Sequence, residues 1–183
     1  MSTFTLLGIS GSLRQDACNR KLLHEAVRVF GEATYVEADL RLPLYDADLE
    51  EAEGIPPEVE KLAAQIKAAD AVLISTPEYN KNLSGVLKNA LDWVSRVKGM
   101  AWKDKPVALM AAADGRAGGE RAMHSLILCM MPFRANLVYG PEVFIANCRE
   151  AFDEDGRLKD EGAEKFLGLL MKKLHGVLED SAT

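Results

Sequence analysis

Short strand patterns alternate with amphipathic helix patterns along almost the whole chain, and this alternation constrains the fold more than any other feature. Residues 4–9 (FTLLGI) and 71–75 (AVLIS) are continuous apolar runs of strand length. Such runs are typical of strands buried on both faces of a sheet. Apolar residues spaced three or four apart follow each run, which indicates a helix. Strands and helices in this order form a parallel sheet with helices on both faces, an α/β fold.

Five strand-and-helix units account for residues 1–183, and we predict a single domain with a doubly wound, five-stranded parallel sheet. The remaining strand patterns cover residues 34–39, 106–112 and, more weakly, 136–139. The helix patterns fall within residues 22–30, 57–66, 86–94, 122–130 and 161–178, and Gly31 stops the first of them. Residues 40–56 are rich in Asp, Glu and Pro and are predicted to be irregular.

The charge and cysteine content excludes several classes of protein. The chain carries 22 Lys and Arg against 28 Asp and Glu, a net charge of −6, with no basic block that would bind nucleic acid. No apolar run approaches the roughly 20 residues that cross a bilayer, so no membrane partner is expected. The chain start lacks the charged segment of a signal peptide. Cys18, Cys129 and Cys148 are too far apart for a zinc motif, so we expect no metal and reduced thiols in a cytoplasmic protein.

The loop after the first strand, residues 8–20, has the composition of a phosphate site. Ser10, Ser12 and Asn19 offer side-chain donors, Arg14 offers a planar cation, and the following helix start adds a partial positive charge. The loop is neither a Walker A sequence nor G-x-G-x-x-G, so it favours a monophosphate over a triphosphate or dinucleotide. A plain turn with Asn19 as the helix N-cap explains the same residues, and the loop alone does not decide.

Two further loops belong to the same sheet edge, where ligands bind in open parallel sheets. In residues 75–85, Pro77 stiffens the strand exit, Tyr79 can stack on a flat ligand or pack in the core, and Asn80 tolerates left-handed turns. The glycines of residues 114–119 allow close approach to a ligand, or simply a flexible turn. One loop suits a phosphate, and the two neighbouring loops suit a planar ring. This combination predicts FMN in a flavodoxin-like fold.

Two long segments resemble the NADPH-dependent FMN reductase family, which includes quinone reductases, chromate reductases and azoreductases. They are residues 11–20 (GSLRQDACNR) and residues 77–93 (PEYNKNLSGVLKNALDW), and residues 42–46 and 140–142 also look like family segments. The likeness covers nearly the whole chain. It implies bound FMN, NADPH or NADH as electron donor, a small-molecule electron acceptor, and a homodimer or homotetramer.

The resemblance also implies roles for particular residues. Phosphate contacts fall to Ser12, Arg14 and Asn19, with Ser10 in the same loop. Ring and ribityl contacts fall to Pro77, Glu78, Tyr79 and Asn80, and flavin-edge contacts to Asp114, Gly115, Arg116 and Gly118. The chain departs from the family at Ala17, where a second serine is usual, and at Asp114, which adds negative charge near the ring. The loss of the hydroxyl predicts weaker FMN retention.

No catalytic side chain is expected, because the flavin N5 carries the hydride chemistry. His24, His124 and His175 have no partner in the sequence pattern and are expected to be structural or solvated. One site that serves donor and acceptor in turn predicts ping-pong kinetics. Three alternatives remain: an electron carrier without an NAD(P)H site, a reductase that releases reduced flavin, and a dinucleotide-binding domain that uses Asp39 at the end of the second strand.

Apolar residues near the third and fourth helices predict a subunit interface that completes the site. They are Trp93, Met100, Ala101, Trp102, Met123, Met130, Met131 and Phe133. Methionine side chains adapt well to interfaces, although an apolar helix face of this kind also serves as a monomer core.

Overall fold

The structure, a computed structural model, describes residues 3–138 and 140–182. Strands and helices alternate in the predicted order. The strands are β1 (Phe4–Ser10), β2 (Ala33–Glu37), β3 (Ala71–Thr76), β4 (Pro106–Ala112), β5 (Asn136–Val138) and β6 (Phe144–Ile145). The helices are α1 (Cys18–Phe30), α2 (Ala47–Glu53), α3 (Pro57–Ala68), α4 (Gly85–Arg96), α5 (Glu120–Met130) and α6 (Glu161–Ala182), with a 3₁₀ turn, η1 (Met131–Phe133), after α5.

The strands form one parallel sheet in the order β2-β1-β3-β4-β5. This order is the flavodoxin-like one, and it reverses direction between β1 and β3. The fifth position is filled by two short segments: β5 pairs with the start of β4, and β6 pairs with its end. The five-stranded prediction is confirmed, but the split was not foreseen. The last residue of the predicted strand 136–139 lies outside the described residues.

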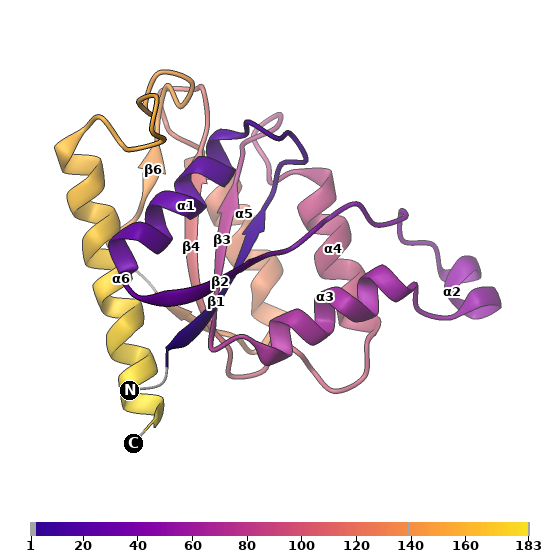
Figure 1. Cartoon of the computed structure of the whole chain (residues 1–183). Helices are drawn as coiled ribbons and strands as arrows, with labels where there is room; N and C mark the ends of the chain where they lie inside the picture. Colours follow the sequence, from indigo (N-terminus) through magenta and orange to yellow (C-terminus); the bar gives the residue numbers. More distant parts are fainter. Residues whose placement is uncertain (1–2, 139, 183) are drawn as a thin grey trace.

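Two layers of helices cover the sheet (Figure 1): α1 and α6 lie on one face, and α3, α4 and α5 on the other. Each face has its own core. Leu6 and Leu7, neighbours in β1, belong to opposite cores and are 0% and 1% exposed. Because successive side chains of a strand point to opposite faces, a strand between two helix layers must be apolar throughout. This is the physical reason for the continuous apolar runs.

One predicted irregular segment is partly helical. Residues 40–56, called the arm below, contain α2 and extend away from the body of the molecule (Figure 1). The Asp46 side chain caps the helix by accepting from the Asp48 N–H at 2.9 Å. No residue of α2 is buried. Hydrophobic periodicity therefore could not reveal the helix; Asp46 and Gly54, at φ 82°, were its only local signals.

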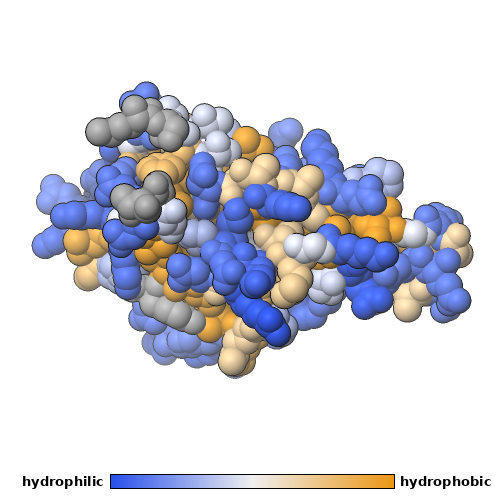
Figure 2. All heavy atoms as spheres, turned by 90° about the horizontal axis from the view of Figure 1, so that it is seen from below, coloured by the Kyte–Doolittle hydropathy of each residue, from blue (hydrophilic) through white to orange (hydrophobic). Residues whose placement is uncertain are grey.

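Four of the eight residues of the predicted interface are buried in the monomer core. Trp93, Trp102, Met123 and Met130 are all less than 5% exposed. Met100 and Met131 remain 52% and 68% exposed. On the face seen from below, hydrophobic side chains form patches among hydrophilic ones (Figure 2). Across the described residues, no helix is both long and apolar enough to span a membrane.

Candidate functional site

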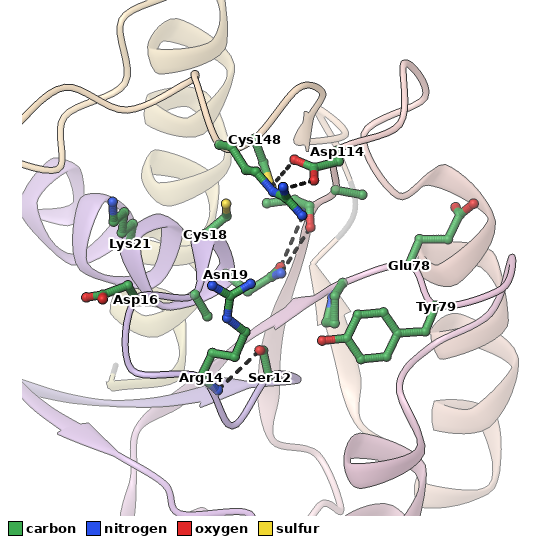
Figure 3. A pocket seen from close by; sticks show the side chains of 15 residues that line it. Ser12, Arg14, Asp16, Cys18, Asn19, Lys21, Glu78, Tyr79, Asp114 and Cys148 are labelled. Carbon is green, nitrogen blue, oxygen red and sulfur yellow. Dashed lines mark hydrogen bonds and ion pairs between the residues drawn. The ribbon is translucent and has the colours of Figure 1, made fainter.

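A cavity of about 430 Å³ lies at the carboxyl ends of β1, β3 and β4, beside the reversal of strand order. Its wall comes from the loops after these strands and from the segment after β6 (Figure 3). The lining residues are Ser12, Arg14, Asp16, Ala17, Cys18, Asn19, Lys21, Pro77, Glu78, Tyr79, Ala112, Ala113, Asp114, Cys148 and Arg149. The cavity therefore lies where the strand order predicts a ligand.

The first loop is held tightly against the second. The Gly11 N–H donates to the Ser75 carbonyl at 2.8 Å, and the Ser84 hydroxyl donates to the Gly11 carbonyl at 2.6 Å. A Cβ on Gly11 would lie 2.8 Å from Pro77 Cδ, so only glycine allows the two loops to approach this closely. The backbone of the predicted phosphate loop is thus fixed before any ligand arrives.

The two predicted serines have different roles. Ser10 Oγ donates to the Ser12 carbonyl at 3.2 Å and accepts from the Ser12 N–H at 3.3 Å. Ser10 does not line the cavity, so it shapes the loop from within. The Ser12 hydroxyl accepts from the Arg14 N–H at 3.4 Å and keeps its own proton available at the cavity wall.

The start of α1 supplies an open anion site. Ala17 is the N-cap residue and makes no side-chain capping bond, and no acidic residue lies in the first turn. Within residues 3–138 and 140–182, the first two N–H groups of α1, those of Cys18 and Asn19, have no acceptor, and the Arg14 guanidinium has no partner. Free helix N–H groups, a hydroxyl and an unpaired guanidinium are the donors that a phosphate dianion requires. The residues present therefore fit the phosphate of FMN.

Asn19 corrects one interpretation from the sequence. It lies inside α1 rather than at its N-cap, and it is 3% exposed. Its Nδ2 donates to the Ala112 carbonyl at 3.0 Å, while its Oδ1 accepts from the Ala112 N–H at 3.1 Å and from Ser75 Oγ at 2.8 Å. The side chain thus ties α1 to the ends of β3 and β4 and positions the anion site.

Pro77 and Tyr79 form the wall on the other side of the cavity. Pro77 is buried against Gly11, whereas Tyr79 is 50% exposed. In Figure 3 the Tyr79 ring stands at the cavity edge, facing Ser12 and Arg14 across the opening. A half-exposed ring beside a buried proline is suited to contact a flat ligand.

Glu78 and Asn80 contribute less directly than predicted. The Glu78 carboxylate points away from the cavity (Figure 3), accepts from the Arg121 N–H at 3.2 Å, and lies 3.7 Å from the Arg121 guanidinium. It therefore caps α5 and offers the cavity only its backbone. Asn80 and Lys81 have φ values of 51° and 67° in a tight turn, which confirms the left-handed conformation foreseen for Asn80. Asn80 does not line the cavity.

Only Asp114 of the third loop reaches the cavity; Gly115, Arg116 and Gly118 do not. Gly118 has a φ of 61°, and a Cβ there would lie 2.7 Å from the Phe144 carbonyl carbon. This glycine is required for packing against β6 and does not line the cavity. The negative charge of Asp114 is paired with Arg149 at 2.6 Å.

The sequence interpretation missed Asp16, Cys18, Lys21, Cys148 and Arg149. Cys148 and Arg149 come to the sheet edge because β6 delivers them there. That strand has two residues, too few to give a periodic signal. Lys21 is a half-buried residue one turn into α1, which the loop motif alone did not reach.

Comparisons with known proteins agree with this geometry. The model of the NADPH-dependent FMN reductase family matches residues 4–150. The chain is 42% identical over 164 residues to an NAD(P)H-dependent FMN reductase of Pseudomonas aeruginosa, with 88% of each chain covered. It is 35% identical over 166 residues to the quinone reductase of Escherichia coli K12, covering 88% of this chain and 87% of that one. The structure is similar to FerB, a flavoenzyme NAD(P)H:(acceptor) oxidoreductase from Paracoccus denitrificans, with a TM-score of 0.86, 32% identity, and 97% and 98% of the two chains covered.

Proposed function

Because the chain belongs to the NADPH-dependent FMN reductase family, we propose that it reduces quinones through FMN held in the cavity beside β1 and β3. Members of this family are oxidoreductases that use FMN and NAD(P)H. The observation that carries the proposal is the open anion site at the start of α1, with Ser12 and Arg14 beside it. Bound FMN supplies reversible hydride chemistry, which no side chain can supply.

The protein's own residues hold and orient the cofactor. Ser12, Arg14 and the first N–H groups of α1 bind the phosphate, while Asn19 keeps that helix start in register with the strand ends. Pro77 and Tyr79 supply the wall on which the ring rests. Because one cavity serves both substrates, NAD(P)H and the acceptor use it in turn, which gives ping-pong kinetics.

Proton transfer by histidine has no place in this scheme. None of the three histidines lines the cavity. His24 lies 3.2 Å from the Glu37 carboxylate, and His175 packs edge-on against Phe4. Asp39, the acid of the dinucleotide alternative, lies past the end of β2 and pairs with Arg41 at 3.1 Å. His24, His175 and Asp39 therefore make their contacts outside the cavity.

The direct test combines a spectrum with an activity assay. The purified protein should show flavin absorbance bands, or gain them on addition of FMN. It should then oxidise NADPH or NADH in the presence of a benzoquinone, with parallel double-reciprocal lines as the quinone concentration is varied. Failure to bind FMN at micromolar levels would exclude the proposal. Flavin binding without NAD(P)H oxidation would favour a simple electron carrier.

A second function, release of reduced FMN as product, has its own support. The Pseudomonas aeruginosa relative is named an FMN reductase, and Ala17 removes a hydroxyl from the wall beside the phosphate site. Gel filtration of the loaded protein after reduction by NADPH separates the two functions. FMN that stays with the protein supports a quinone reductase with resident cofactor. FMN that elutes separately only after reduction supports the second function. Chromate and azo compounds belong in the same acceptor panel.

We further propose a homodimer or homotetramer, with the arm and the two exposed methionines of the predicted set, Met100 and Met131, as its contacts. The arm is anchored to α4 at two points: Trp93 Nε1 donates to the Pro43 carbonyl at 2.8 Å, and Arg96 pairs with Glu50, in α2, at 2.9 Å. Leu44, next to that anchor, is 80% exposed. Tyr45 beside it is 37% exposed, so the two neighbours form an apolar patch on an anchored segment that a second copy could bury. Light scattering should give at least twice the 20.0 kDa chain mass.

A further inference from the structure

The three cysteines are divided between the two faces of the sheet. Cys129, in α5, packs against the core under α3, α4 and α5. Cys18 and Cys148 pack together in the other core, under α1 and α6. The sheet therefore separates Cys129 from the other two thiols. Cys18 and Cys148 lie on the same side of it, although they are 130 residues apart in sequence. All three are free thiols.

The paired thiols lie side by side in the cavity wall. Both side chains line the same cavity, where Figure 3 shows them as neighbours, and both belong to the same core cluster. Cys18 is the first residue of α1 and is half-buried, so solutes in the cavity can reach it. Cys148 is buried at 7% exposure and donates to Asp114 Oδ1 at 3.7 Å. The site thus holds an accessible thiol, a sheltered thiol beside it, and a carboxylate that accepts from the sheltered thiol.

We propose that Cys18 and Cys148 form a reversible disulfide in the wall of the cavity when the protein meets hydrogen peroxide. Peroxide oxidises the Cys18 thiol to a sulfenic acid and is itself reduced to water. The Cys148 sulfur then attacks the Cys18 sulfur, the S–O bond breaks, and the hydroxyl leaves as a second water. The two thiols thus lose two hydrogens and two electrons in all, and one peroxide becomes two waters.

Asp114 has a defined part in the second step. Burial, together with the hydrogen bond to Cys18 and the negative charge of Asp114, raises the pKa of the Cys148 thiol above its ordinary value. Cys148 therefore stays protonated near neutral pH, and its proton must leave as its sulfur attacks. The Asp114 carboxylate already accepts that S–H, so it is the group placed to receive the proton. Cys18 is the more exposed thiol and is oxidised first.

Peptide mapping of the purified full-length protein tests the disulfide directly. After treatment with equimolar peroxide, the intact mass should fall by two hydrogen atoms and recover with dithiothreitol. Tryptic digestion should then join residues 15–20 (QDACNR) to residues 135–149 (ANLVYGPEVFIANCR), and leave residues 122–134, which contain Cys129, unlinked. Cys129→Ser is the matched control and should cross-link normally. A stable sulfenic or sulfinic acid on Cys18, a linkage to Cys129, or an intermolecular disulfide would overturn the proposal.

Variants separate the two steps. Cys148→Ser should let the Cys18 sulfenic acid accumulate, which a dimedone adduct detects, whereas Cys18→Ser should abolish both adduct and cross-link. Asp114→Asn should slow closure of the disulfide at least severalfold while leaving sulfenic acid formation unchanged. An unchanged closing rate in this variant would remove Asp114 from the step.

Saturation with FMN should slow the oxidation, because both thiols line the cavity that the cofactor fills; this expectation alone rests on the proposed function. A disulfide that forms at the same rate with and without FMN would count against the FMN site but not against the thiol pair.

Discussion

The two sides of the cavity are built differently. On the phosphate side, Ser10, Ser12 and Asn19 are each less than 10% exposed and hydrogen bonded within the loop or to the strand ends. On the ring side, Tyr79 is half-exposed, and Asp114 is held by a surface pair with Arg149 and a long hydrogen bond from the Cys148 thiol. Buried hydrogen-bond networks specify one conformation, whereas exposed ion pairs contribute little. If FMN binds as proposed, the protein would fix the cofactor rigidly by its phosphate and leave the ring side able to accept different substrates.

The largest expected effect comes from breaking the phosphate side at its centre. Asn19→Ala removes three buried hydrogen bonds, to the Ser75 hydroxyl and to the N–H and carbonyl of Ala112. The free energy of unfolding should fall by about 3 kcal/mol, and FMN should bind more weakly. Denaturant unfolding measures the loss. Asn80→Gly is the control on the ring side, because it relieves a positive φ in an exposed turn, and it should change stability by less than about 0.5 kcal/mol. Equal losses of unfolding free energy in the two variants would contradict the claim that the phosphate side is the more rigid one.

Arg14→Ala should come next. Loss of the guanidinium should weaken FMN by about 1.5–3 kcal/mol, the range for a hydrogen bond to a charged group, and should affect riboflavin much less. Fluorescence titration with both flavins measures the difference. Arg116→Ala, an exposed arginine outside the cavity, should leave both affinities unchanged. Equal losses for FMN and riboflavin would mean that Arg14 acts through the fold.

A smaller change is expected on the ring side. Tyr79→Ala should weaken FMN by about 1 kcal/mol, because only an aromatic contact on one ring face is lost. If the ring side adapts to its substrates, this variant should change the KM for a quinone more than it changes the FMN affinity. Steady-state kinetics at saturating FMN provide that comparison. An effect on FMN as large as that of Arg14→Ala would place the main anchor at the ring.

The smallest effect should come from restoring the serine that is usual in the family. Ala17 lines the cavity and is the uncapped N-cap of α1. Ala17→Ser should therefore tighten FMN and also stabilise the flavin-free protein by about 0.5–1 kcal/mol as a helix cap. Titration and thermal unfolding of the flavin-free protein separate these gains. Unchanged FMN affinity with higher stability would make residue 17 a capping position only.

The fold was predictable because the pattern of apolar residues within each short segment indicates whether that segment is a strand or a helix. Strands between two helix layers must be apolar on both faces, as at Leu6 and Leu7, so alternation along the chain directly reported the topology. Helix α2 was not predicted because it buries no residue and so has no apolar periodicity. Strand β6 was not predicted because two residues are too few to show a periodic pattern.

The site was predictable in outline only. The sequence placed Ser12, Arg14, Pro77 and Tyr79 on the cavity wall, where the structure has them. It did not foresee that Asn19 is a brace between strands, or that Glu78 caps α5, since both depend on contacts across long sequence separations. Cys148 and Arg149 reach the cavity only through β6, and were missed for the same reason.

The central claim is that this cavity holds FMN by its phosphate. The most direct measurement is a titration of the flavin-free protein with FMN and with riboflavin, which share the ring and ribityl chain and differ only in the phosphate. The rigid anion site at the start of α1 predicts that FMN binds at micromolar concentration or tighter, and at least about 100-fold more tightly than riboflavin, equivalent to roughly 2.7 kcal/mol. Equal affinities for the two flavins would contradict the account.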